Sequence, residues 1–239
     1  MLLHTPPPSL SEAIALFLDF DGTLTALQSD PDAVHISDLQ TDALASLSER
    51  LGHAVAVVSG RDIRDLSKRV PTSLWRAGNH GLYVCPPEVM PQDTLTPAPD
   101  SLVQSLTRVQ DSFPGTRLEL KGQVLALHYR ATPESETDVK AAAQAVIDEH
   151  DEYKLQSGKF VLEAKPVAAN KGHAVAELMK LPPFEGRTPV MVGDDTTDED
   201  AMEAVIASGG WAVKVGTGDS LAQYRLADPA AVWNWLGEG

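Results

Sequence analysis

The chain has 239 residues, 43% of them hydrophobic, which is enough for one large domain or for a core with a smaller inserted domain. Its 34 acidic residues outnumber its 19 lysines and arginines, and the resulting formal charge of −15 argues against a protein that binds nucleic acid through clustered cations. No apolar stretch approaches the roughly 20 residues that cross a bilayer, so we expect no membrane association, and the single cysteine, Cys85, fits a reducing, cytoplasmic location.

The N-terminal part alternates short apolar runs with segments of helical periodicity. The predicted strands are residues 13–18, 53–58 and 75–78, and the predicted helices are residues 38–51 and 62–70. Strands that are apolar on both faces and alternate with helices are typical of a parallel sheet covered by helices on both sides.

The pattern changes after Gly81, where a proline-rich stretch begins. The elements predicted next are a helix at 101–113, strands at 116–121 and 124–130, a helix at 134–149 and strands at 153–157 and 160–165. A helix followed by a hairpin, twice in succession, is an α+β arrangement, unlike the part before it. We therefore expect an inserted domain at residues 84–162.

The first pattern returns after Pro166. We predict helices at 170–181, 198–207 and 229–236, and strands at 188–192 and 211–215. The fold class is accordingly α/β, with a doubly wound parallel-sheet core built from residues 1–83 and 163–239 around the inserted domain.

Two carboxylates follow the first predicted strand, in the sequence Asp-Phe-Asp-Gly-Thr at residues 19–23. Asp19 could attack phosphorus as a nucleophile, while Asp21 donates a proton to the leaving alcohol and later activates water. Taken alone, the same five residues could be a turn with helix-capping side chains.

Acidic residues also crowd the end of the strand at 188–192, in the sequence Gly-Asp-Asp-Thr-Thr-Asp-Glu-Asp at residues 193–200. Carboxylates packed so closely repel one another, and hard oxygen ligands suit Mg²⁺. Acids at a helix N-terminus would account for residues 198–200, but less easily for Asp194 and Asp195.

Ser59, Gly60 and Arg61 end the second predicted strand, and Lys171 lies where the core resumes. A hydroxyl, helix N-terminal amides and a compact ammonium can all hold a phosphoryl group, although each of these residues alone is commonly a cap or a solvated charge. Because ligands of open α/β sheets bind beyond the carboxyl ends of the strands, we expect these residues and the two aspartate clusters to converge.

In their order, these motifs resemble the haloacid dehalogenase (HAD) superfamily of phosphatases, and the insert falls where members with a C2-type cap carry theirs. Further motifs resemble, more narrowly, the trehalose-6-phosphate phosphatase family: Ser59-Gly60-Arg61, Gly78-Asn79-His80-Gly81, Glu119-Leu120-Lys121-Gly122, His128-Tyr129-Arg130, Glu163-Ala164-Lys165-Pro166 and Asn170-Lys171-Gly172. Tyr83 departs from this pattern, since many relatives carry an acidic residue soon after the His-Gly pair.

The resemblance implies a role for each matching residue. Asp19 would be the nucleophile and Asp21 the general acid/base, with Ser59 and Lys171 binding the phosphoryl group. Mg²⁺ would be held by Asp19, Asp194 and the backbone carbonyl of Asp21, with Asp198 supporting it through water. The substrate-binding residues would be Arg61, Asn79, His80, Glu119, Lys121, Arg130 and Glu163.

Alternation in the insert places Glu119 and Lys121 on one strand face, and His128 and Arg130 on one face of the partner strand. Such a mixture of donors and acceptors suits a sugar, although a solvated sheet face is the common fate of alternating polar residues.

The function that the resemblance implies is hydrolysis of trehalose 6-phosphate to trehalose and phosphate, with a trehalose-6-phosphate synthase as the pathway partner. Two alternatives stay open: a capped phosphatase for another sugar phosphate, and a catalytically silent domain that binds sugar phosphate as a regulator.

Overall fold

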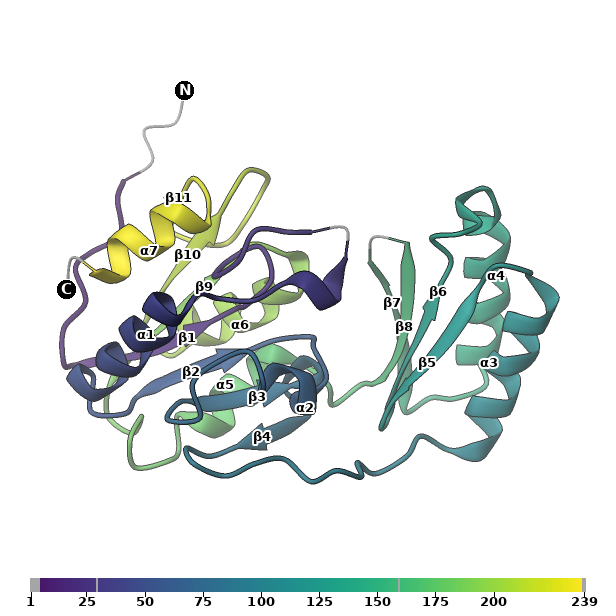
Figure 1. Ribbon diagram of the computed structural model, residues 1–239, viewed down its shortest axis with the longest axis horizontal. Coiled ribbons are helices and arrows are strands. Elements are labelled where there is room, and N and C mark those ends of the chain that lie inside the picture. Colours follow the sequence, from purple (N-terminus) through teal and green to yellow (C-terminus); the bar gives the residue numbers. More distant parts are fainter. Residues whose placement is uncertain (1–4, 29, 159, 238–239) are drawn as a thin grey trace. The chain divides into compact units, whose positions relative to one another are not determined.

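The computed structural model describes residues 5–28, 30–158 and 160–237 (Figure 1). The chain forms two compact units. The first runs as far as Pro91 and resumes at Asn170, and the second is Gln92–Ala169.

The first unit is the predicted α/β core. Its elements are β1 (Ile14–Leu18), η1 (Pro31–Ala33), α1 (Asp38–Arg50), β2 (Val55–Val58), α2 (Ile63–Leu66), β3 (Trp75–Gly78), η2 (Asn79–Gly81), β4 (Tyr83–Cys85), α5 (Lys171–Leu178), β9 (Thr188–Gly193), α6 (Thr196–Ala207), β10 (Trp211–Val215), β11 (Tyr224–Leu226) and α7 (Pro229–Gly237). Within the described ranges its sheet has seven strands in the order β11-β10-β9-β1-β2-β3-β4.

Every neighbouring pair of strands in this sheet is parallel except β3 and β4, which are antiparallel. The predicted parallel sheet is therefore confirmed. The two edge strands β4 and β11 were not predicted, because three residues are too few to show a periodicity and only pairing with a neighbour defines them.

Alternate residues of the strands face opposite layers of helices, which explains the continuous apolar runs. Leu16 and Leu18 of β1 pack in a cluster with residues of α1 and α7, whereas Ala15 and Phe17 pack with residues of α5 and α6 (Figure 1). Helix α1 begins at a capping box, in which Ser37 and Gln40 bond to each other's backbone amides.

The second unit has the predicted helix–hairpin–helix–hairpin order. Its elements are α3 (Asp100–Ser112), β5 (Arg117–Lys121), β6 (Val124–His128), η3 (Pro133–Ser135), α4 (Glu136–Ile147), β7 (Tyr153–Gly158) and β8 (Val161–Pro166). The strands form an antiparallel sheet in the order β5-β6-β8-β7, and apolar residues of one face pack against α3 and α4.

The boundaries of the second unit lie further along the chain than the expected 84–162. Strand β4 pairs with β3 and so keeps residues 83–85 in the first unit. Strand β8 lies between β6 and β7, which keeps residues 161–166 in the second unit. Strand pairing, which the sequence does not display, decides both boundaries.

No helix within the described ranges is long and apolar enough to cross a membrane.

Candidate active site

Strands β1 and β9 lie side by side at the point where the strand order reverses. Leu18 pairs with Val192, and the amide of Asp19 donates a 2.9 Å hydrogen bond to the carbonyl of Val192. The acids that follow these two strands are thereby brought to one edge of the sheet, at the switch point where open α/β sheets bind ligands.

Three carboxylates meet at this edge. Among the described residues, one carboxylate oxygen each from Asp19, Asp194 and Asp198 lies within 4.8 Å of the others. Asp19 and Asp198 are buried, the latter completely at 0% exposure. Buried carboxylates are costly unless cations or hydrogen-bond donors compensate them.

Lys171 provides part of that compensation. Its ammonium, 3% exposed, donates hydrogen bonds of 2.7 Å to Asp19 Oδ1 and to Asp198 Oδ1. Burial acts to lower the pKa of Lys171, but the charges of Asp19 and Asp198 outweigh burial and raise this pKa above its usual value. Lys171 is therefore a permanent cation in the site.

Lys171 occupies this place because of how α5 begins. The side chain of Asn170 accepts a hydrogen bond from the amide of His173 and so caps the helix. A Cβ on Gly172 would stand 2.3 Å from the carbonyl oxygen of Asp200, so glycine permits α5 to approach the start of α6 closely.

One ammonium among three carboxylates leaves excess negative charge, and the pKa values reflect this. Burial, followed by repulsion from Asp198, raises the pKa of Asp19 well above its ordinary value, and Lys171 opposes this shift only in part. Burial, followed by repulsion from Asp198 and Asp195, raises the pKa of Asp194 to about 6. The site therefore favours a proton or a cation.

Asp198 holds the loop that carries Asp194. Its Oδ2 accepts hydrogen bonds of 3.0 Å from the backbone amides of Asp194 and Asp195. Lys214, buried in β10, donates to the backbone carbonyl of Asp194 from the other side. Asp194 is thus fixed through its backbone, which leaves its carboxylate available for a ligand.

The residues at this edge fit a divalent cation. Asp194 Oδ1 is buried and has no hydrogen-bond partner in the described part of the chain. A Cβ on Gly22, whose φ is +85°, would lie 2.1 Å from Asp194 Oδ2, so the absence of a side chain leaves room for that carboxylate. An all-oxygen donor set with surplus negative charge suits a hard cation such as Mg²⁺.

The carboxylate of Asp21 is outside this cluster and forms an ion pair with Arg61. Arg61 Nε and Nη2 donate to the two oxygens of Asp21, each at 2.7 Å, and the guanidinium lies over the ring of Phe20. Arg61 was expected to bind substrate. In this structure it holds the predicted general acid/base, and its contact with substrate stays a prediction.

Ser59, Asn79 and His80 lie together at the ends of β2 and β3. The Ser59 hydroxyl accepts a 3.2 Å hydrogen bond from the amide of Arg61, and Asn79 Oδ1 accepts one of 2.9 Å from the amide of Ile63. Asn79 is completely buried and its side chain serves the start of α2, while its expected contact with substrate stays a prediction. The ring of His80 packs against Gly60, where a Cβ would be 2.7 Å from His80 Cε1.

The polar face of the second unit brings together three of the four predicted sugar-binding residues. Glu119 Oε2 lies 2.8 Å from His128 Nε2, and Lys121 Nζ lies 3.5 Å from Glu163 Oε1. The hydrogen bond with His128 is the largest cause of a lowered pKa of Glu119, which burial opposes.

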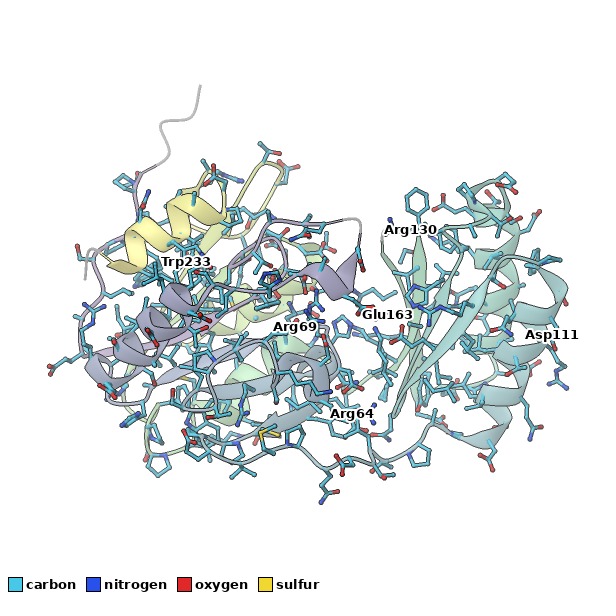
Figure 2. The ribbon with its side chains drawn as sticks, in the orientation of Figure 1. Arg64, Arg69, Asp111, Arg130, Glu163 and Trp233 are labelled. Carbon is cyan, nitrogen blue, oxygen red and sulfur yellow. The ribbon has the colours of Figure 1, made fainter. Side chains whose placement is uncertain are left out.

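Arg130 lies beyond the end of strand β6. Strand β6 ends at His128, and the Arg130 guanidinium lies 5.5 Å from the centre of the Phe160 ring (Figure 2). Because β6 ends at His128, strand alternation does not by itself assign Arg130 to the face of His128.

Three residues of the site were missed by sequence reasoning: Lys214, Asp65 and Arg69. A lysine inside the apolar strand β10 is a signal for Lys214. Asp65 lies four residues after Arg61 and four residues before Arg69, which is the spacing of ion pairs along a helix. This spacing could have indicated both contacts.

Comparison with known proteins gives a consistent result. A family model described as Trehalose-phosphatase matches residues 17–230. The chain is 37% identical to the trehalose-6-phosphate phosphatase of Escherichia coli K12, an alignment that covers 97% of this chain and 88% of that protein. It is 35% identical to a probable trehalose-phosphate phosphatase of Sinorhizobium fredii, over 84% of this chain and 77% of that one.

Solved structures agree on the fold. The C-terminal domain of Candida albicans trehalose-6-phosphate phosphatase superimposes with a TM-score of 0.78 at 23% identity, covering 95% of this chain and 92% of that one. A haloacid dehalogenase-like hydrolase from Bacteroides thetaiotaomicron gives a TM-score of 0.68 at 14% identity, with coverages of 94% and 98%. The first unit is thus a HAD-type core and the second its inserted cap.

Proposed function

The chain belongs to the trehalose-phosphatase family, and we propose that it hydrolyses trehalose 6-phosphate to trehalose and inorganic phosphate through an aspartyl phosphate on Asp19. The observation that carries this proposal is the hydrogen bond between Lys171 and Asp19 at the carboxyl end of β1. It gives a buried carboxylate a permanent cation beside it, as a nucleophile that must receive an anionic phosphoryl group requires.

In the first step, a carboxylate oxygen of Asp19 attacks phosphorus and the bond from phosphorus to the C6 oxygen of the sugar breaks. Asp21 donates a proton to that oxygen, so trehalose leaves as a neutral alcohol. Lys171 and the hydroxyl of Ser59 bind the oxygens of the phosphoryl group as charge develops on them.

In the second step, Asp21 has become a carboxylate and takes a proton from water. The water oxygen attacks phosphorus, the bond to Asp19 breaks, and inorganic phosphate is released. Asp21 therefore acts as acid and then as base. Its pairing with Arg61 holds the carboxylate in one orientation and favours the ionised form that the second step needs. For the first step, Asp21 must carry a proton on one oxygen, so the bond from Arg61 to that oxygen opens.

Asp19 and Asp194 would hold Mg²⁺ together with the backbone carbonyl of Asp21, and Asp198 would support the ion indirectly. Bound there, Mg²⁺ supplies positive charge that offsets the charge of the phosphoryl oxygens. The buried, unpaired Asp194 Oδ1 and the surplus of carboxylates support this assignment.

The polar face of the cap is the proposed source of sugar specificity. Glu119 and Lys121 on β5 and Glu163 on β8, the two strands that flank β6, present acceptors and a donor, which suits the hydroxyl groups of a disaccharide. For Arg130, stacked on Phe160 beyond the strand end, we propose a contact at the margin of this face.

The test is phosphate release from trehalose 6-phosphate, glucose 6-phosphate and sucrose 6-phosphate, each with and without Mg²⁺. We expect metal-dependent release from the trehalose ester that greatly exceeds release from the other two. Comparable release from all three would retain the phosphatase and overturn the sugar assignment. No release from any would favour a silent sugar-phosphate-binding domain.

Two further proposals follow from this function. Trehalose 6-phosphate must be made by a synthase, which we propose as the pathway partner, and the single cysteine of the chain supports a location in the reducing cytoplasm. In the same assay, phosphate release from glucose 6-phosphate and sucrose 6-phosphate tests the alternative that the substrate is another sugar phosphate.

A further inference from the structure

We propose that Asp65 is a positioning residue for the reaction: through Arg61, it fixes the orientation of the Asp21 carboxylate. This inference rests on the proposed function, in which Asp21 is the general acid/base. The residues involved are Asp21, Arg61, Asp65 and Arg69, which form successive ion pairs from the site to the backbone near η1.

The first link is the fork between Arg61 and Asp21. Both Asp21 oxygens accept from Arg61, at 2.7 Å each, so rotation of the carboxylate would break both bonds. The Asp21 side chain is 31% exposed, whereas that of Arg61 is 11% exposed. Packing therefore leaves Asp21 some freedom, and the guanidinium is what restrains it.

The second link restrains Arg61 itself. A long arginine side chain has many rotamers, so it can orient Asp21 only if its own guanidinium is held. Arg61 Cζ lies over the ring of Phe20, 5.4 Å from its centroid, and Nη1 donates 2.9 Å to Asp65 Oδ2. The contact with Phe20 and the bond to Asp65 together limit the positions that the guanidinium can take.

The third link restrains Asp65. Arg69 Nε and Nη2 donate to its two oxygens at 2.8 and 2.7 Å. Arg69 Nη1, in the first unit (Figure 2), donates in turn to the backbone carbonyl of Val34. Burial opposes the ionised form of Asp65, but the bonds from Arg69 and Arg61 prevail and lower its pKa.

A comparison of two leaving groups can distinguish a positioning role of Asp65 from a purely stabilising one, because the benefit of general acid catalysis depends on the leaving group. The alkoxide of a sugar needs a proton as it leaves, whereas p-nitrophenolate, a weak base, leaves without one. The parameter kcat/KM reports the steps up to release of the alcohol or phenol, before Asp21 acts as a base.

The experiment compares kcat/KM of Asp65→Asn for trehalose 6-phosphate and for p-nitrophenyl phosphate. We expect a loss of roughly tenfold with the sugar ester, a part of the ~10²–10⁴-fold that general acid catalysis contributes, and less than about a twofold change with the aryl ester. Arg69→Gln should give the same pattern with a smaller loss. Asp65→Glu, which keeps the charge, should recover part of the activity on the sugar ester.

Arg64→Gln is the matched control. Arg64 forms a 2.7 Å ion pair with Asp62 in the same turn of the chain, and we expect its loss to leave the ratio between the two substrates unchanged. Equal losses on both substrates in Asp65→Asn, or no loss on either, would overturn the positioning role.

Failure of the proposed function has a different signature. If the wild-type protein ignores trehalose 6-phosphate but cleaves another alkyl phosphate, the same comparison is made with that ester. If it cleaves only the aryl phosphate, then no proton donor acts in the site. This result would rule out both the general acid role of Asp21 and the positioning role of Asp65.

Discussion

The ammonium of Lys171 lies 2.7 Å from Asp19 Oδ1, although 152 positions separate the two residues in the sequence. The whole cap is inserted between them. This contact joins the residue that follows the first core strand to the helix with which the core resumes, and it contributes to the charge balance of the site. Four predictions concern this site and the polar face of the cap.

Replacing Lys171 by methionine should destabilise the protein by about 3–5 kcal/mol, because it leaves the buried carboxylates of Asp19 and Asp198 without their cation. Protonation can relieve this charge, so the loss should be smaller at acidic pH. Urea denaturation of the metal-free protein, at neutral and at acidic pH, measures both effects. Lys180→Met, which removes an exposed ion pair with Glu177, should change stability by less than about 1 kcal/mol.

Asp19→Asn should lower kcat by at least roughly 10³-fold, because an amide cannot form the acyl phosphate. Since burial and Asp198 already raise the pKa of Asp19, losing its charge should leave the metal-free protein at least as stable as the wild type. Phosphate release and thermal unfolding together check this. Substantial residual turnover in this variant would contradict the assignment of the nucleophile.

Mg²⁺ should stabilise the protein more at neutral than at acidic pH. The pKa of Asp194 is about 6 in the folded protein, above its ordinary value of 3.8, so folding takes up a proton between these values. The stabilisation from that proton is complete below about pH 3.8 and is lost as the pH rises through about 6, while Mg²⁺ competes for the same carboxylate.

Thermal unfolding with Mg²⁺ and with a chelator, at about pH 5 and at about pH 7.5, measures this difference. We expect the gain in Tm from Mg²⁺ to be greater at the higher pH, and Asp194→Asn to reduce both the gain and its dependence on pH. A gain that is the same at both pH values would contradict a metal site at Asp194.

Glu119→Gln should lower kcat/KM for trehalose 6-phosphate by roughly 10- to 100-fold, the worth of a hydrogen bond to a charged group. It should leave kcat/KM for p-nitrophenyl phosphate nearly unchanged, because that ester carries no sugar. Steady-state kinetics on both substrates decide the matter. Arg108→Gln, on the helical side of the cap, is the control and should alter neither value; a parallel loss on both substrates would indicate a damaged cap.

Much of the fold follows from local patterns in the sequence. The buried strands of the core are continuous apolar runs. Alternating strands and a change in the order of elements indicate the insert. The ends of elements follow less well. Strand β6 stops at His128, two residues before its predicted end, and the Asn79 side chain bonds to the first amide of α2, a contact that no local pattern indicates.

The sequence by itself determined which residues are candidates for the chemistry, because the proposed nucleophile, the acids and the lysine each follow a recognisable strand or open a helix. The tertiary structure alone decided how they are paired: Lys171 with Asp19 and Asp198, Asp21 with Arg61, and Asp65 with Arg61 and Arg69. Local periodicity specifies which way a side chain faces within its own element. Which charge it meets depends on strand order and helix packing, which bring together groups that lie far apart in the chain.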